Sequence, residues 1–312
     1  MHFDWQAFES TLCNDLGVEI EIKDVEPVSG GDISRAFKLT TNDKDFFVKL
    51  NRPDAEQMFR IEWSGLAELD AVPGIRVPEP MCVGRTQNAA YFVMEFVDLV
   101  PEIDPALAGA AVADLHGLEH TRFGWDQNNF IGATVQQNSW HAGWAEFYWN
   151  CRLEPQLVGA IESGFSILEK TMAPLHKKTM ELLEHHYVVP SLLHGDLWQG
   201  NIALSTSSEI VLYDPAVYWG DPETDIAATR LFNGFSKEFY QAYYAHIPLQ
   251  DGAEERLSLY QLYHWLNHLN QFGQSYLDQT LNCISELYAS QHRPSSVSEP
   301  RNNGDHHTGS DG

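Results

Sequence analysis

Three polar residues near the middle of the chain have types and spacing that suit phosphoryl transfer. Asp196 and Asn201 are five residues apart, and Asp214 follows thirteen residues later. A carboxylate can orient a hydroxyl nucleophile, while a carboxamide and a second carboxylate are oxygen ligands for a divalent cation. In phosphoryl transfer the protein mainly orients the nucleophile and neutralises phosphate charge through Mg²⁺. We therefore interpret Asp196 as a candidate base and Asn201 and Asp214 as candidate metal ligands.

The residues between these three predict how they come together. Residues 202–204 and 210–213 have the composition of two short strands, and residues 205–208 between them are typical of a turn. A hairpin of this length returns Asp214 to the side of Asn201. One loop then holds the candidate base with both metal ligands beside it.

Two glycines near the N-terminus are candidates for contact with phosphate. Gly30 and Gly31 stand between residues 18–28, which alternate in polarity like a strand, and the strand-like residues 37–39. A glycine pair between two strands lets backbone N–H groups approach phosphate oxygens. An ordinary glycine-rich hairpin turn is the commoner explanation of such a pair, so both interpretations stay open.

Lys49 lies on a predicted strand, residues 46–50, that is otherwise apolar. An unpaired buried ammonium is costly, so a lysine there requires a partner. The next predicted helix, residues 55–69, carries Glu62 on a face with apolar side chains. A Lys49–Glu62 pair that holds the α- and β-phosphates of a nucleotide is one interpretation. The other is a solvated lysine at a strand end and a surface carboxylate on the helix.

The composition describes a globular chain with an acidic surface. Its 312 residues can bury a large core in one or two domains, and 43% of them are hydrophobic. The net charge of −25 argues against a nucleic-acid partner, because phosphate binding needs clustered lysine and arginine. The apolar runs are short and interrupted, so no transmembrane span is expected. Residues 1–20 contain no lysine or arginine, so a signal peptide is not indicated.

Metal and disulfide frameworks are not expected from the cysteines and histidines. The spacing of the cysteines is neither CxxC nor zinc-like, and we predict reduced thiols in the core of a cytoplasmic protein. The four cysteines are Cys13, Cys82, Cys151 and Cys283. His264 and His268 are four residues apart on a predicted helix, but no third ligand follows with motif spacing, so a zinc site is not expected.

The chain divides best near residue 97. Residues 1–97 are rich in predicted strands and end with the buried-looking strand 91–97. Residues 98–290 are mainly helical, apart from a loop-like segment at 121–140. The predicted helices cover residues 105–116, 143–157, 168–186 and 255–272. Residues 291–312 are polar and rich in Pro, Ser, Asn and Gly, which is typical of a disordered tail.

Several stretches together have a specific order. They are Leu193-His194-Gly195-Asp196-Leu197-Trp198-x-Gly200-Asn201, Asp214-Pro215-Ala216-Val217-Tyr218-Trp219-Gly220, Glu223-x-Asp225-x-Ala227, Phe123-Gly124-Trp125 with Ile131-Gly132, Asn138-x-Trp140 with Trp144-x-x-Phe147-Tyr148, and Leu266-Asn267-His268-Leu269-Asn270-x-Phe272-Gly273. With the glycine turn, the strand lysine and the helix glutamate, they resemble the protein-kinase-like fold of small-molecule kinases. This is a two-lobed α+β fold with a small β-rich N-lobe and a larger, mainly helical C-lobe. More narrowly, the sequence resembles the fructosamine kinase (ketosamine 3-kinase) family, which is related to the aminoglycoside phosphotransferases.

The resemblance implies roles for the catalytic and phosphate-binding candidates. Asp196 would accept or orient the proton of the substrate hydroxyl, and Asn201 and Asp214 would hold Mg²⁺ between the phosphates of ATP. Lys49, fixed by Glu62, would contact the α- and β-phosphates. These positions match the motif of the family residue by residue.

The resemblance also implies how the N-lobe binds ATP. The Gly30-Gly31 turn would lie over the phosphates, and adenine would hydrogen-bond the backbone near Glu95 and Val97. Asp32 stands where some relatives carry cysteine, so redox control through that position is not expected.

The C-lobe supplies the candidates for the substrate pocket. Trp198 on the catalytic loop and His268 on the late helix combine an aromatic face with a hydrogen-bonding imidazole, which suits a polyhydroxylated ketoamine. Packing of a core Trp and His is the alternative. Asp221 and Glu223 are explained as acidic residues near a helix start. Asp225 is expected to brace the backbone of the catalytic loop.

The implied activity is transfer of the γ-phosphoryl group of ATP to the 3-hydroxyl of a ketosamine such as a ribulosamine or fructosamine, free or attached to a peptide or protein. The implied physiological role is protein deglycation. We expect ATP and a ketosamine as partners, with no nucleic acid or membrane, and a cytoplasmic monomer or weak dimer.

Two alternative functions stay open. One is a related kinase for an aminoglycoside, choline or homoserine; the other is a catalytically dead nucleotide-binding scaffold, which is disfavoured because no catalytic position is missing.

Overall fold

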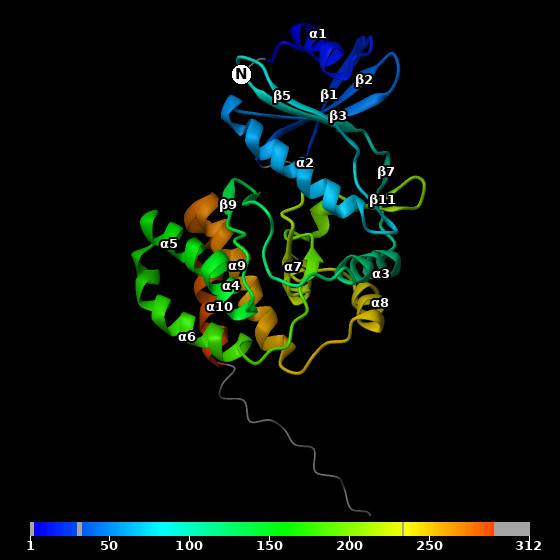
Figure 1. The fold of residues 1–312 in the computed structure, drawn as a ribbon. Helices are drawn as coiled ribbons and strands as arrows, with labels where there is room; N and C mark the ends of the chain where they lie inside the picture. The colour runs from blue at the N-terminus through cyan, green and yellow to red at the C-terminus, as the bar shows by residue number, and fades with distance from the viewer. Residues whose placement is uncertain (1–2, 30–32, 233, 290–312) are drawn as a thin grey trace, which may run out of the picture.

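The computed structural model describes residues 3–29, 33–232 and 234–289. These residues form two lobes, a β-rich N-lobe and a larger C-lobe built mainly from helices (Figure 1). The predicted two-lobed α+β fold is therefore confirmed. The predicted tail at 291–312 lies outside the described residues.

A five-stranded antiparallel sheet forms the N-lobe. Its strands in spatial order are β1 (Ile22–Val28), β2 (Arg35–Thr41), β3 (Asp45–Asn51), β6 (Ala90–Glu95) and β5 (Pro80–Arg85). Helices α1 (Trp5–Leu16) and α2 (Glu56–Asp70) cover its opposite faces (Figure 1). Side chains alternate between faces along a strand, so β6 sends Tyr91 and Val93 toward the α1 side and Phe92 and Met94 toward the α2 side.

A second sheet ties the predicted hairpin to both lobes. It consists of β4 (Ile75–Arg76), β12 (Ile210–Leu212), β11 (Ile202–Ser205) and β7 (Leu99–Val100) in spatial order. The hairpin β11–β12 is antiparallel, which confirms the sequence prediction. Its outer neighbours are β4, which follows α2 in the chain, and β7, which follows the N-lobe sheet. Because β4 falls within residues 1–97 yet pairs with β12, the division of the chain at residue 97 stays a prediction.

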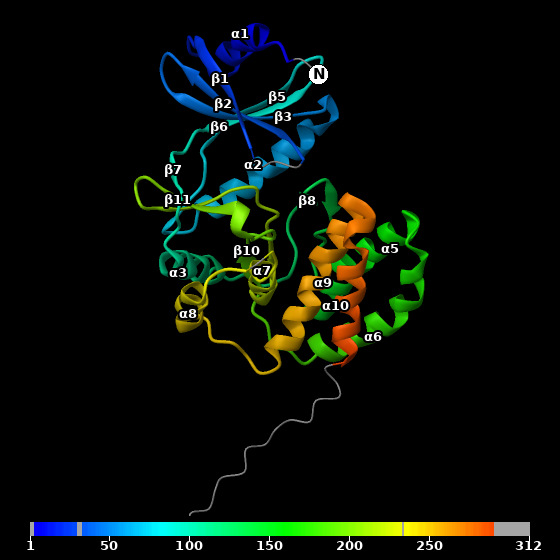
Figure 2. The ribbon, with the colours of Figure 1, turned by 180° about the vertical axis from the view of Figure 1, so that it is seen from behind.

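In the C-lobe, α5, α6, α7 and α10 pack against α9, while α3 packs against α8. The helices are α3 (Pro105–His116), α4 (Trp144–Tyr148), α5 (Glu154–Glu162), α6 (Met172–Leu183), α7 (Glu223–Thr229), α8 (Lys237–His246), α9 (Ala253–Phe272) and α10 (Leu277–Ala289). The predicted apolar stripe on α9 is buried, with Leu259, Leu262, Leu266 and Leu269 each at 0% exposure. Figure 2 shows α9 and α10 side by side. The small sheet β10 (Ser191–Leu193) and β13 (Tyr218–Gly220) completes the support of the catalytic loop.

The structure corrects parts of the helix and loop predictions. The segment at 121–140 is not only a loop, because it contains the paired strands β8 (Asn129–Ile131) and β9 (Thr134–Gln136). The predicted helix at 143–157 is interrupted by a π-helical turn at Trp149–Leu153. The helix predicted at 168–186 is shorter, since its first part is a 3₁₀ turn. These local irregularities leave the apolar periodicity almost unchanged, so sequence patterning does not reveal them.

The remaining composition-based expectations concern membranes and cysteines. In the part of the chain that the structure describes, no helix has the length and apolar character needed to cross a membrane. The four cysteines are free thiols, and three of them are buried.

Helices α3 and α8 pack closely because α3 has a glycine, Gly109, at their contact. We therefore predict that a methyl group added at this position destabilises the fold. A Cβ at Gly109 would lie 2.2 Å from the backbone oxygen of Phe239, so the helices would have to separate. We expect Gly109→Ala to lower the free energy of unfolding by about 1–3 kcal/mol, measured by urea denaturation. Gly159→Ala in α5 is the matched control. Its Cβ would make only a 3.5 Å contact, so it should be neutral or stabilise by up to about 1 kcal/mol. Equal stability of both variants would contradict the prediction.

Candidate active site

A cleft of about 1230 Å³ gathers the predicted site residues. It is lined by β2, β3 and α2 from the N-lobe, by residues 95–98, which we call the hinge, and by α9 and residues 194–201, which we call the catalytic loop. The predicted residues in its lining are Lys49, Glu62, Glu95, Val97, Asp196, Trp198, Asn201, Asp214 and His268. Gly30 and Gly31 lie outside the described residues, so their contact with phosphate stays a prediction.

Lys49 provides a buried positive charge at the floor of the cleft. Its side chain extends from β3, is 8% exposed, and places Nζ 2.5 Å from Oε1 of Glu62 on α2. The same Nζ also contacts Oδ1 of Asp214. Burial alone would lower the pKa of Lys49, but the carboxylates of Asp214 and Glu62 raise it above its ordinary value. Of the two interpretations of Lys49, the structure therefore has the paired one, and the ammonium stays charged.

Asp196 and Asn201 are held together by the backbone of the catalytic loop. Nδ2 of Asn201 donates to the carbonyl oxygen of Asp196 at 2.8 Å and approaches its Oδ2 at 3.3 Å. The hairpin then brings the chain back, because the N–H of Tyr213 donates to the carbonyl of Asn201 at 3.2 Å. Asp214 follows directly, so the predicted return of Asp214 to the side of Asn201 is confirmed.

Asp225 braces the start of the catalytic loop. Its Oδ2 accepts the N–H of His194 at 2.7 Å, and its Oδ1 accepts the N–H of Gly195 at 2.9 Å. The imidazole of His116 lies 3.2 Å away on the other side. Burial would raise the pKa of Asp225, but these donors hold it below its ordinary value. The expectation that Asp225 supports the loop backbone is confirmed, since each of its carboxylate oxygens accepts a backbone N–H of the loop.

The backbone near the site adopts a positive φ at two positions. Gly195 has φ +82°, and a Cβ there would lie 2.0 Å from the carbonyl oxygen of Ala216, so glycine is required. Asp214 adopts φ +56°, a left-handed conformation that is uncommon for a residue with a side chain. In this conformation the Asp214 carboxylate faces Lys49 across the cleft.

The electrostatics of the loop prepare Asp196 for proton exchange. Burial, followed by the negative charges of Asp214 and Asp225, raises the pKa of Asp196 from 3.8 to about 7, and the amide of Asn201 opposes that shift. A carboxyl group with a pKa near neutrality accepts a proton more readily than an ordinary aspartate. His194 is different, because burial lowers its pKa and its Nε2 lies 3.0 Å from the carbonyl of Tyr213. We therefore assign His194 a structural role as a neutral imidazole.

Trp198 and His268 lie on one aromatic wall of the cleft. Phe232 connects them, with ring centroids 6.2 Å from Trp198 and 5.1 Å from His268. Beyond His268 the wall continues through Phe272 and Tyr276. Trp198, Phe232 and Phe272 are 38%, 39% and 43% exposed, which is unusual for such large apolar side chains. Sequence reasoning missed Phe232, because it stands in an irregular segment and no motif marks it.

The hinge offers backbone groups to the cleft. The Glu95 side chain turns to Arg76, with its Oε1 2.5 Å from Nη2, so the carboxylate is committed to an ion pair. The N–H of Glu95 donates to the carbonyl of Glu79 at 2.9 Å. Val97 lies just beyond β6, and among the described residues its N–H makes no backbone hydrogen bond.

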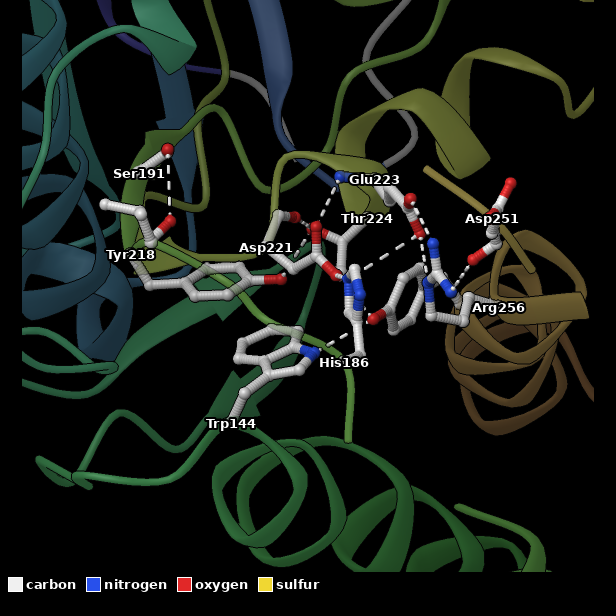
Figure 3. A network of polar contacts seen from close by, with 11 residues as sticks. Trp144, His186, Ser191, Tyr218, Asp221, Glu223, Thr224, Asp251 and Arg256 are labelled. Atoms are coloured by element: carbon white, nitrogen blue, oxygen red, sulfur yellow. Dashed lines mark hydrogen bonds and ion pairs between the residues drawn. The ribbon is translucent and has the colours of Figure 1, made fainter. Parts of the chain in front are cut away.

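Asp221 and Glu223 belong to a polar network at the start of α7, shown in Figure 3. Oδ1 of Asp221 accepts the N–H of Glu223 at 2.9 Å, which confirms its role at the helix start. Its Oδ2 lies 2.9 Å from Nε2 of His186 and accepts the hydroxyl of Tyr260 at 2.6 Å. Arg256 holds both oxygens of Glu223 at 2.7 Å. Sequence reasoning missed His186 and Arg256, whose contacts cross 33 or more residues of chain.

This network also contains a group of potential metal ligands. Ligand atoms of His186, Asp221 and Glu223 lie within 4.8 Å of one another. Both carboxylates, however, already face donors, and Arg256 neutralises Glu223 bidentately. We interpret the group as an ion-pair network that fixes the start of α7, and thereby Asp225, rather than as a metal centre.

Comparison with known proteins defines the class. The family model for fructosamine kinase matches residues 4–290. A probable ketoamine kinase of Vibrio parahaemolyticus is 39% identical over 91% of this chain and 99% of its own length. A chloroplastic protein-ribulosamine 3-kinase of Arabidopsis thaliana is 38% identical over 86% of this chain and 84% of its own length. The chain therefore belongs to the fructosamine kinase family.

Solved structures agree with this assignment. A fructosamine-3-kinase family structure from Haemophilus somnus has a TM-score of 0.83 and 30% identity, covering 91% of this chain and 97% of that one. The aminoglycoside phosphotransferase APH(4)-Ia, solved with AMP-PNP and hygromycin B, has a TM-score of 0.60 and 18% identity, covering 91% and 95%. At that identity the second likeness shows only the shared protein-kinase-like fold.

The bracing role of Asp225 predicts a specific loss. Asp225→Asn keeps the shape but turns an amide donor toward one of the two backbone N–H donors. We expect it to lower the free energy of unfolding by about 1–3 kcal/mol, measured by urea denaturation, because a buried donor loses its acceptor. Asp278→Asn, an exposed change, should stay within about 0.5 kcal/mol of the parent chain. An unchanged free energy of unfolding for Asp225→Asn would contradict the proposal that Asp225 stabilises the catalytic loop.

Proposed function

We propose that the chain is an ATP-dependent kinase that transfers the γ-phosphoryl group to the 3-hydroxyl of a ketosamine, such as a ribulosamine or fructosamine adduct. The observation that carries the proposal is the convergence of Lys49, Asp196, Asn201 and Asp214 in one interlobe cleft. Membership of the fructosamine kinase family and the similarity to a protein-ribulosamine 3-kinase support this acceptor class. The proposed physiological role is deglycation, because a 3-phosphate makes the sugar adduct labile.

Asp196 is the proposed base. Its pKa of about 7 means that a substantial fraction of the carboxyl is ionised at neutral pH and can accept the proton of a sugar hydroxyl. Asn201 and the braced backbone at His194 and Gly195 fix the position of Asp196. Orientation of this kind is the main contribution of a protein to phosphoryl transfer.

Asn201 and Asp214 are the proposed ligands of Mg²⁺, and their chemistry fits that ion. Nδ2 of Asn201 is committed to the carbonyl of Asp196, which leaves its Oδ1 as the ligand atom. The Asp214 side chain is 43% exposed to the cleft. Together they offer the hard oxygen donors that Mg²⁺ prefers, with room for phosphate oxygens. When bound, the ion would neutralise the phosphate charge.

The N-lobe is the proposed ATP-binding half. Lys49, oriented by Glu62, would contact the α- and β-phosphates, and the Gly30-Gly31 turn would cover them. Adenine would bind the backbone near Glu95 and Val97. The unengaged N–H of Val97 supports this position, because an adenine nitrogen can accept its hydrogen bond.

The acceptor side of the cleft favours a polyhydroxylated acceptor over a polycationic one. Trp198 and His268 are the proposed substrate contacts on the aromatic wall. The residues of α9 that line the cleft are His264, Asn267, His268, Gln271 and Phe272. They contain no carboxylate, and burial lowers the pKa of His264 to about 3, so its imidazole is neutral. A polycationic aminoglycoside would find no counter-charge on this wall, which favours a ketosamine over that alternative.

The open aromatic wall also supports access for a glycated peptide or protein. Three of its rings, those of Trp198, Phe232 and Phe272, are 38–43% exposed, so the amine part of an adduct can extend toward solvent. We propose that the protein is a monomer or a weak dimer. The four free thiols support a reducing compartment, and we propose the cytoplasm.

A substrate panel tests the function. Purified protein with ATP and Mg²⁺ should release ADP with ribulose-, erythrulose- or fructose-derived lysine adducts, and it should not turn over aminoglycosides, choline or homoserine. Asp196→Asn should lower kcat on the best substrate by about 100-fold or more, while Asp278→Asn should not change it. Absence of turnover on any ketosamine would overturn the proposal. Full activity of Asp196→Asn would show that another group is the base.

The raised pKa of Asp196 predicts a pH-dependent stability difference. The folded chain keeps this proton up to about pH 7, whereas an ordinary aspartate loses it near 3.8. The stabilising contribution of the protonated form is therefore present at low pH and is lost as the pH rises through 7. Asn cannot ionise, so Asp196→Asn should raise Tm over the parent chain at pH 8.5 by more than at pH 5, by at least about 2 °C. An equal difference at both pH values would contradict the prediction.

A further inference from the structure

Arg152 is a fully buried arginine, at 0% exposure, in the C-lobe. It belongs to the π-helical turn Trp149–Leu153 between α4 and α5, and turns of this kind often interrupt helices at functional sites. A guanidinium without water needs acceptors for its donors, because burying a charge is otherwise very costly. The partners of Arg152 therefore show what its charge is used for.

Carbonyl groups and aromatic rings compensate the two terminal nitrogens of Arg152, while its buried Nε has no hydrogen-bond partner among the described residues. Its Nη1 donates to the carbonyls of Gln137 at 2.5 Å and Cys151 at 2.8 Å, and its Nη2 donates to Oδ1 of Asn138 at 2.8 Å. The guanidinium carbon lies 3.9 Å from the ring centroid of Tyr218. None of the ion pairs among the described residues includes Arg152.

From Asn138 a chain of carboxamides leads to the backbone beside the proposed metal site. Nδ2 of Asn138 donates to Oδ1 of Asn129 at 2.8 Å, and Nδ2 of Asn129 donates to the carbonyl of Val217 at 2.7 Å. Gln136 adds a second branch, since its Nε2 donates to Oδ1 of Asn129 at 2.8 Å and to the carbonyl of Ala216 at 2.9 Å. We call Asn129, Gln136 and Asn138 the carboxamide relay.

Arg152 determines the direction of this relay. An arginine has only donors, so Asn138 must turn its oxygen toward Arg152 and its amide toward Asn129. Asn129 must then turn its oxygen toward Asn138 and its amide toward the carbonyl of Val217. Gln136 follows the same direction, because its Nε2 faces Oδ1 of Asn129 and the carbonyl of Ala216, and its Oε1 accepts the hydroxyl of Tyr263 at 2.8 Å. Both branches therefore end in donors aimed at consecutive backbone carbonyls.

Those carbonyls fix the segment that follows Asp214. Ala216 is also held from the opposite side, because its N–H donates to the carbonyl of His194 at 2.8 Å. A left-handed aspartate such as Asp214, with φ +56°, persists only where the surrounding backbone is well fixed. Backbone anchored from two sides at Ala216 and Val217 provides that constraint.

We propose that Arg152 is a positioning residue for Asp214. Acting through the carboxamide relay, it holds the backbone of Ala216 and Val217 and thereby the direction of the Asp214 carboxylate. The inference rests on the proposed function of Asp214 as a metal ligand. It also gives a role to Asn129, Asn138 and Arg152, to which the proposed catalytic mechanism assigns none.

The test compares three variants of the full chain. Arg152→Met removes the donors at the head of the relay, and Asn129→Ala removes its link to the carbonyl of Val217 without unpairing a carboxylate. Arg122→Met is the matched control, an exposed arginine that also lies over an aromatic ring, that of Trp140, at 5.0 Å. Two readouts do not depend on turnover. One is ADP affinity by calorimetry with and without Mg²⁺, and the other is hydrogen exchange of residues 214–219.

In both relay variants, ADP affinity without Mg²⁺ should stay within about 2-fold of the parent chain, while the gain from Mg²⁺ should fall by about 10-fold or more. Hydrogen exchange at 214–219 should be faster, and Arg122→Met should match the parent chain. A purely structural role would lower the folded fraction without changing the Mg²⁺ effect.

An unchanged Mg²⁺ effect and unchanged exchange in the folded variants would overturn the proposal. If Arg152→Met does not fold, Asn129→Ala alone decides by the same two readouts. A parent chain that turns over a ketosamine but binds ADP without any Mg²⁺ effect overturns the metal role of Asp214, and the inference with it. Absence of turnover by a parent chain that shows the Mg²⁺ effect counts only against the proposed acceptor.

Discussion

The close placement of three carboxylates, Asp196, Asp214 and Asp225, is the constraint on which the site depends. Burial raises the pKa of Asp196, and the charges of Asp214 and Asp225 raise it further. Each of the three carboxylates has a different partner that compensates its charge. Lys49 contacts Asp214, while backbone N–H groups and His116 hold Asp225 ionised. The side chain of Asp196 receives only the amide of Asn201, and its pKa is raised to about 7.

The scaffold around these carboxylates links the two lobes through the site itself. The hairpin β11–β12 carries Asn201 at one end and Asp214 at the other. Its outer neighbours are β4, which lies between β3 and β5 in the chain, and β7, which follows the N-lobe sheet. The proposed metal ligands are therefore attached to the junction of the lobes. The C-lobe supports the same loop from below through α7, whose start is fixed by the network of Asp221 and Glu223 (Figure 3).

The acidic composition of the chain and the character of its acceptor wall are independent. The net charge is −25, yet the residues of α9 that face the cleft contain no carboxylate, and burial keeps His264 neutral. Net charge therefore describes the solubility of this protein rather than its acceptor. The acceptor side is defined by exposed rings, including Phe232, and this distinguishes it from the charged phosphate side around Lys49.

Local spacing by itself determined the hairpin, the strand lysine and the order of Asp196, Asn201 and Asp214, because a short loop or a single strand fixes those relations. The family resemblance was also present in the sequence, since its motifs are contiguous. Only the tertiary structure decided the rest. Arg152 lies 65 residues from Val217, and the carboxamides between them stand in a segment without helical or strand periodicity that was predicted as a loop. Their roles arise from hydrogen bonds across the fold, and residue type or spacing carries no record of such contacts.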